Sequence, residues 1–154
     1  MEQNGRRNDL GCPPAADSAL IDIWIPIRPV AQARARGVSF GGQVRMYTPE
    51  KSRKFKFQFS ELISRAVGRI DPISEAVVLR IEIMLERPKS ARKRLLPTVK
   101  PDLDNYEKSV MDACTEAGIW TDDSLVTTKF SCKRYADERG PGIAIAVWAE
   151  SADR

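Results

Sequence analysis

Aspartates are concentrated in one short part of this 154-residue chain, between positions 101 and 123. Lys108 lies among them, and they are Asp102, Asp104, Asp112, Asp122 and Asp123. The chain as a whole has a formal net charge of +4, so a general need for solubility does not explain a cluster of acids. The plainest physical reason to hold several carboxylates together is a divalent cation between them. The basic remainder suggests that this cation acts on a polyanion.

The spacing within this segment favours a shared site. If a helix covers residues 104–116, Lys108 lies about 40° and Asp112 about 80° around the axis from Asp104. The three side chains then share one flank over roughly 12 Å of helix.

The remaining aspartates lie on either side of that helix. Asp102 falls in the extended segment before it, and a return of the chain to a sheet could bring Asp122 or Asp123 beside the same end. Converging carboxylates repel one another, so without a cation at least one would protonate. Mg²⁺ prefers oxygen ligands and uses one or two carboxylates with water and phosphate oxygens, which suits phosphodiester cleavage. Lys108 could then stabilise the transition state or the leaving group.

Each acid also has an ordinary structural explanation. Asp104 alone can cap a helix, and Asp104 with Lys108 forms an i,i+4 ion pair worth about a few tenths of a kcal/mol. Asp112 can pair with Lys108 as well, and Asp122–Asp123 can form a plain turn. The residues by themselves leave these alternatives open.

Histidine is absent from the chain. Its absence excludes Ser-His and Cys-His triads, HExxH zinc sites and histidine bases, so catalysis must use carboxylates, lysine, hydroxyls or a metal. Three isolated cysteines, Cys12, Cys114 and Cys132, are expected to be reduced thiols. No apolar run approaches the roughly 20 residues of a membrane span, and the N-terminus lacks a signal-peptide core. We therefore expect a cytoplasmic protein with no membrane partner.

Basic residues fall into three clusters, within 28–45, 51–56 and 87–100, and the isoelectric point is about 9.1. Small residues around the arginines of the first cluster let the backbone approach phosphates closely. Such runs are also common on plain solvated surfaces, and that alternative stays open. The candidate DNA contacts are Arg34, Arg36, Arg45, Lys51, Arg53, Lys54, Lys89, Arg92, Lys93 and Arg94.

The hydrophobic pattern predicts an α+β fold. Apolar residues at helical spacing predict one helix from Thr48, as its N-cap, to Gly68, and a second over 104–116. Alternating or β-branched runs predict strands at 21–27, 43–47, 76–85, 124–135 and 142–148. The order ββαβαββ favours a single domain with one mixed sheet of about five strands and two helices packed on it.

The other segments are expected to be irregular. Residues 28–42 and 87–100 are predicted to be basic loops. Residues 1–19 are predicted to be a disordered extension, 20–149 the folded domain and 150–154 a short tail.

The aspartate motif resembles one protein family. Residues 101–113 read Pro-Asp-Leu-Asp-Asn-x-x-Lys-x-Val-x-Asp-Ala, and residues 118–126 read Gly-Ile-Trp-x-Asp-Asp-Ser-Leu-Val. Both are similar to the RusA-type Holliday junction resolvases, endodeoxyribonucleases common in phages and prophages. The N-terminal half is similar as well, with Gln32 in an Arg-rich loop that leads to Arg45-Met-Tyr-Thr-Pro. The likeness covers roughly residues 20–148.

The resemblance implies a Mg²⁺-dependent homodimer, with Mn²⁺ as an alternative ion, that resolves four-way DNA junctions by paired symmetric nicks. Asp122 would be an alternative metal ligand or a support for the ligands, and Asp112 would contact Lys108 or the neighbouring loop. Tyr106 and Glu107 depart from the aliphatic residues usual there, and Glu107 adds a charge near the site. The essential side chains of the family fall on Asp102, Asp104, Lys108 and Asp123.

Two other functions remain open at this point. A non-catalytic DNA-binding module would use the acids as caps and turns only, and an Asp104→Asn variant that binds but does not cut separates it from a nuclease. A metal nuclease for flaps or forks would share the chemistry but act on other branched DNA. A panel of branched substrates distinguishes that enzyme from a resolvase.

Overall fold

The structure, a computed structural model, describes residues 14–33 and 36–150. Most of the expected N-terminal extension, Arg34 and Cys12 lie outside these residues. The elements, in chain order, are η1 (Ala16–Ser18), β1 (Ile21–Ile25), β2 (Arg36–Phe40), β3 (Gln43–Tyr47), α1 (Glu50–Val67), β4 (Val77–Leu85), η2 (Lys89–Ala91), α2 (Leu103–Glu116), η3 (Asp123–Leu125), β5 (Val126–Tyr135) and β6 (Gly142–Ala149).

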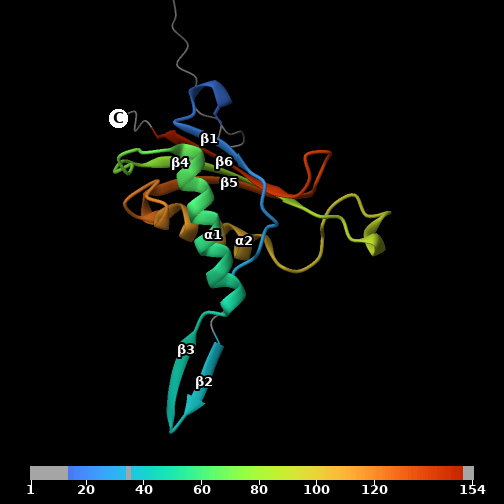
Figure 1. Ribbon diagram of the computed structural model, residues 1–154. Coiled ribbons are helices and arrows are strands. Elements are labelled where there is room, and N and C mark those ends of the chain that lie inside the picture. Colours follow the sequence, from blue (N-terminus) through green and yellow to red (C-terminus); the bar gives the residue numbers. More distant parts are fainter. Residues whose placement is uncertain (1–13, 34–35, 151–154) are drawn as a thin grey trace, which may run out of the picture.

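One mixed sheet has the strand order β1-β6-β4-β5, and both long helices cover the same face of it (Figure 1). Strands β4 and β5 are parallel, so the chain must cross over between them, and α2 lies in that crossover. The other neighbouring strands are antiparallel. The expected α+β class with a mixed sheet and two helices is confirmed.

The sheet has four strands, whereas about five were expected. The difference comes from β3, which was predicted correctly at residues 43–47 but pairs with β2 and not with the sheet. Strand β2 occupies part of the segment that was expected to be a loop, and a Gly41–Gly42 turn with positive φ joins it to β3. Figure 1 shows this hairpin extending away from the sheet, beyond the first turn of α1.

The core lies between the sheet and the helices. Alternate residues of the central strands β4 and β6, such as Leu79, Ile81 and Ile145, are almost completely buried against Phe59 of α1 and Val110 of α2. Each such side chain contributes about 1.5–3 kcal/mol by leaving water. The opposite face of the sheet carries a smaller cluster around Trp148, whose indole N–H donates to the carbonyl of Ala15 at 3.0 Å.

The starts of both helices differ from the prediction. Helix α1 begins at Glu50 with Pro49, not Thr48, as its N-cap, because the Pro49 carbonyl accepts the first helical bond from Arg53. Helix α2 begins at Leu103, so Asp102 and not Asp104 occupies the N-cap position. Gly68 ends α1 as predicted, with a positive φ.

The basic segment after β4 is irregular apart from η2, and Arg87 organises it. The Arg87 guanidinium donates to the carbonyls of Ala91, at 3.3 Å, and of Arg94, and it stacks over the ring of Tyr135. Within 14–33 and 36–150, no helix is long and apolar enough to cross a membrane.

Candidate active site

The first turn of α2 presents two of the predicted catalytic aspartates to solvent. Asp102 has extended backbone angles at the N-cap, and Asp104 is the second helical residue. Both are exposed, as is Lys108 one turn further along. The N-terminal end of a helix dipole is positive and stabilises carboxylates at these two positions.

Lys133 of β5 holds the segment that leads into this turn. Its ammonium group donates to the carbonyl oxygens of Val99, at 2.9 Å, and of Pro101, at 2.8 Å. Hydrogen bonds from a charged donor are stronger than neutral ones. The residue directly before Asp102 is therefore tied to the edge strand of the sheet.

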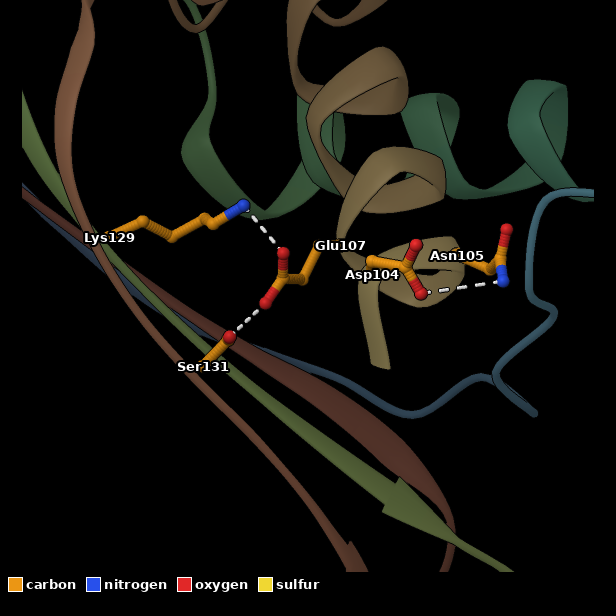
Figure 2. Close-up of polar contacts among 5 residues, drawn as sticks. All are labelled: Asp104, Asn105, Glu107, Lys129 and Ser131. Atoms are coloured by element: carbon orange, nitrogen blue, oxygen red, sulfur yellow. Dashed lines mark hydrogen bonds and ion pairs between the residues drawn. The ribbon is translucent and has the colours of Figure 1, made fainter. Parts of the chain in front are cut away.

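Glu107 makes a second connection between α2 and β5. Its carboxylate pairs with Lys129 at 2.5 Å and accepts a hydrogen bond from the Ser131 hydroxyl (Figure 2). The Glu107 side chain is 13% exposed. The negative charge of Glu107 therefore faces the sheet. Asp104 points away from Glu107 and toward Asn105, whose side-chain amide donates to it at 3.4 Å.

The loop after β1 is fastened to the same end of α2. The backbone N–H of Gln32 donates to the Asn105 carbonyl at 2.9 Å, and that of Ala33 donates to the Ser52 hydroxyl of α1 at 3.3 Å. The start of α2 thus has partners on both sides, β5 on one and this loop on the other.

Asp122 and Asp123 follow α2 in the chain, at the N-cap and the first residue of η3. The segment before them is tied to the last turns of the helix, since Ile119 N–H donates to the Cys114 carbonyl and Trp120 donates to Thr115 at 2.8 Å. Asp122 caps η3, and hydrogen bonds from the side chain and backbone of Ser124 lower its pKa.

Asp102 and Asp104 thus lie at the start of α2, whereas the two residues that are bonded to its last turns, Ile119 and Trp120, shortly precede Asp122 and Asp123. Lys133 of β5 contacts Pro101, just before α2, and Lys129, which comes earlier in the strand, contacts Glu107 further along the helix. Strand β5 therefore runs antiparallel to α2. Asp123 comes before Lys129 in the chain. Asp104 and Thr115 are about 16 Å apart along the axis at 1.5 Å per residue. Among the described residues, no three acidic or cysteine side chains gather closely enough to hold a metal ion. The convergence of Asp102, Asp104 and Asp123 stays a prediction.

Asp102 and Asp104 nevertheless fit a hard divalent cation in their chemistry. Both are exposed oxygen donors, and neither forms an ion pair within the part of the chain that the structure describes. Mg²⁺ commonly takes one or two carboxylates and completes its shell with water and phosphate oxygens. Two carboxylates at one helix end are sufficient for such a site.

Asp112 lies one helical turn after Lys108 on α2. It is half-buried and lines a polar pocket with Arg53 and Ser109, and it forms no ion pair with Lys108. The expected contact between these two residues is therefore not seen as an ion pair.

The expected DNA contacts are distributed over three parts of the fold. Arg36 and Arg45 belong to the paired strands β2 and β3. The exposed residues of the other two parts are Lys51, Arg53 and Lys54 in the first turns of α1, and Lys89, Arg92, Lys93 and Arg94 after β4. Lys54 pairs with Glu50 at 2.7 Å, one turn away.

Sequence reasoning missed the role of Lys133 and of the pair between Glu107 and Lys129. One signal was present, because Lys129, Ser131 and Lys133 alternate along a predicted strand and must share one face. A polar stripe on a strand that lies beside a helix indicates a polar contact between them. Nothing local shows which helix that will be.

Comparison with known proteins agrees with the motif. Residues 26–148 match the family described as Endodeoxyribonuclease RusA. The chain is also 36% identical over 135 residues to the uncharacterized protein YqaN of Bacillus subtilis (strain 168), an alignment that covers 80% of this chain and 92% of that protein. Together with the Pro101–Asn105 segment at the exposed start of α2, these matches show that the chain belongs to the RusA family of endodeoxyribonucleases, the Holliday junction resolvases.

Proposed function

We propose that this protein is a Mg²⁺-dependent, homodimeric endonuclease that resolves four-way DNA junctions by paired symmetric nicks. Family membership supports the reaction class, a metal-dependent endodeoxyribonuclease acting on branched DNA. The observation that carries the finer proposal is the exposed pair Asp102 and Asp104 at the positive end of α2, in a chain whose net charge is +4.

Asp102 and Asp104 hold the ion in this proposal, and Asp123, with Asp122 beside it, is the further ligand that the motif supplies. When bound, the metal supplies a more acidic water and neutralises charge on the phosphate oxygens. Lys108, one turn from Asp104 and free of any ion pair among the described residues, stabilises the phosphate in the transition state.

Exposed basic residues beside this helix bind the substrate. Lys51 and Lys54 on the first turns of α1 and the cations on the segment after β4 contact phosphates, so the choice of junction depends on DNA shape and backbone position. Two copies related by a two-fold axis would offer two equivalent sites to two equivalent strands. Two nicks in one binding event are therefore expected from a dimer.

The decisive experiment is cutting of a synthetic four-way junction with and without Mg²⁺, with product mapping on every strand. Asp104→Asn should reduce cutting to background while junction binding is kept or tightened, since one negative charge is removed near the DNA. Asp22→Asn is the matched control, because Asp22 is exposed on β1, at the edge of the sheet opposite β5. Paired nicks at symmetric positions are expected from the wild type.

Two results would contradict the proposal. Binding without cutting in the presence of Mg²⁺ or Mn²⁺ would leave only a DNA-binding module. Cutting of flaps or forks in preference to four-way junctions would make the enzyme a nuclease of other specificity.

A further inference from the structure

A small polar pocket lies where α1, α2 and the loop after β1 meet. Its volume is about 160 Å³, and every residue that lines it is polar. The lining includes Arg53 and Lys56 of α1, Ser109 and Asp112 of α2, and Gln32 of the loop. At about 30 Å³ per water, the space holds on the order of five water molecules, a scale that suits one small planar ring.

One buried hydrogen-bond acceptor in this pocket has no donor among the described residues. The Gln32 side-chain oxygen is buried and makes no hydrogen bond among the described residues. The carboxylate of Asp112 forms no ion pair there either. A buried acceptor without a donor is unfavourable, so the pocket suits a ligand that brings N–H groups.

Gln32 is held firmly at this position. Its backbone N–H donates to the Asn105 carbonyl of α2, and that of the next residue, Ala33, donates to the Ser52 hydroxyl of α1. These two bonds join the loop to both helices. The unpaired side-chain oxygen is therefore presented by a fixed backbone, as a preorganised binding site requires.

The charges in the pocket disfavour a phosphate as the ligand. Lys56 is already paired with Glu116 at 2.8 Å, and the lining holds the negative charge of Asp112 as well as the positive charge of Arg53. A phosphate diester carries only acceptors and a negative charge, so it would leave Gln32 unpaired and would repel Asp112. A neutral group with both donors and acceptors matches all of these residues.

A nucleobase with an exocyclic amine is such a group. Glutamine and aspartate both accept from base amines, and arginine donates to base acceptors. Asp112 also lies about 40° around α2 from Lys108, so the pocket adjoins the flank that carries the proposed catalytic residues. Removal of a base from the stack costs about a few kcal/mol, least where its pairing or stacking is already interrupted, and the stack of a four-way junction is interrupted at the branch point.

We propose that this pocket binds one unpaired, amine-bearing nucleobase from the branch point, with Gln32 and Asp112 accepting from its amine and Arg53 donating to its ring. The inference rests on the proposed action on branched DNA. It makes the pocket the part of the enzyme that reads base identity beside the cut.

The test uses four-way junctions with 2-aminopurine at each position around the crossover in turn, bound without metal so that no strand is cut. 2-Aminopurine becomes brighter when it leaves the stack. We expect a several-fold rise at one position with the wild type and little rise with Gln32→Met, which removes the acceptor at similar size. Gln58→Met, an exposed glutamine of α1 outside this pocket, is the matched control and should behave as the wild type.

A second measurement tests which base is preferred at the junction position where 2-aminopurine brightens. Junctions with adenine, cytosine or guanine there should be bound or cut roughly tenfold or more better than the junction with thymine, which has no exocyclic amine. Gln32→Met and Asp112→Asn should each reduce that preference. Circular dichroism checks that both variants are folded, and the wild-type measurements stand without them.

The outcomes separate this inference from the proposed function. A junction that is bound and cut, with no position brightening or with thymine accepted equally, overturns the base pocket alone. Brightening that Gln32→Met leaves unchanged also overturns it. A protein that cuts no DNA but shows Gln32-dependent brightening supports the pocket and refutes the nuclease.

Discussion

Lys133 of β5 donates a hydrogen bond of 2.8 Å to the carbonyl oxygen of Pro101, the residue directly before Asp102. A second bond to Val99 makes the contact bidentate. The ammonium group thus joins the edge of the sheet to the segment that presents the proposed metal ligands.

Removal of this contact should weaken metal binding more than it weakens the fold. Lys133→Met should raise the Mg²⁺ concentration for half-maximal junction cutting by roughly 10- to 100-fold, a range typical of residues that support metal ligands. Lys133→Arg should recover much of the loss, because it keeps a charged donor. Arg134→Met removes the same charge from the adjacent residue and is the control. An unchanged Mg²⁺ requirement in Lys133→Met would contradict the proposed support of the metal ligands by Lys133.

The pair between Glu107 and Lys129 should stabilise the packing of α2 on β5. Glu107→Gln should lower the free energy of unfolding by about 1–2 kcal/mol, because Lys129 and Ser131 lose an ionic acceptor that is largely shielded from water. The double variant with Lys129→Met should show a coupling of about 0.5–1 kcal/mol, since Lys129 is partly exposed. Urea unfolding measures both values. Glu61→Gln, an exposed position, should change stability by less than about 0.5 kcal/mol.

Junction affinity should fall steeply with salt, because each phosphate contact releases counterions. Lys93→Ala should reduce the slope of log K against log salt by about one and should weaken binding to all junction sequences alike. Arg69→Ala removes an exposed cation that lies outside the three basic clusters, so its slope should equal that of the wild type. Equal slopes for both variants and the wild type would show that Lys93 does not contact DNA.

Stability should decrease at alkaline pH because of Cys114. Burial raises the pKa of its thiol to about 12, above the value of about 8.5 in an unfolded chain. The stabilisation is complete below the unfolded pKa and is lost as pH rises toward 12, since the unfolded chain releases its proton first. Between pH 7 and pH 10 the wild type should lose about 1–2 kcal/mol more than Cys114→Ala does, as measured by urea unfolding. Parallel losses in the two proteins would contradict the assignment.

Much of the fold was predictable because its signals are local. The strand at 43–47 and the end of α1 at Gly68 were predicted correctly, since both depend on neighbouring residues and a glycine with positive φ. The helix starts shifted by one or two residues because several polar residues near each start could serve as caps. Pairing of β2 with β3 outside the sheet, which left the sheet with four strands, could not be predicted from alternation within each strand.

By itself, the sequence determined the chemistry available to this protein. It supplied aspartates and a lysine without histidine, a basic surface, and a motif specific enough to indicate the family. Tertiary structure alone decided which of those groups are neighbours. It brought Lys133 to Pro101 and Gln32 to the pocket between the helices, and it bonded Trp120, three residues before Asp123, to Thr115 in the last turn of α2. The reason is physical. The periodicity of a segment shows which of its residues share one face. Which other segment packs against that face depends on contacts between residues that are distant in sequence.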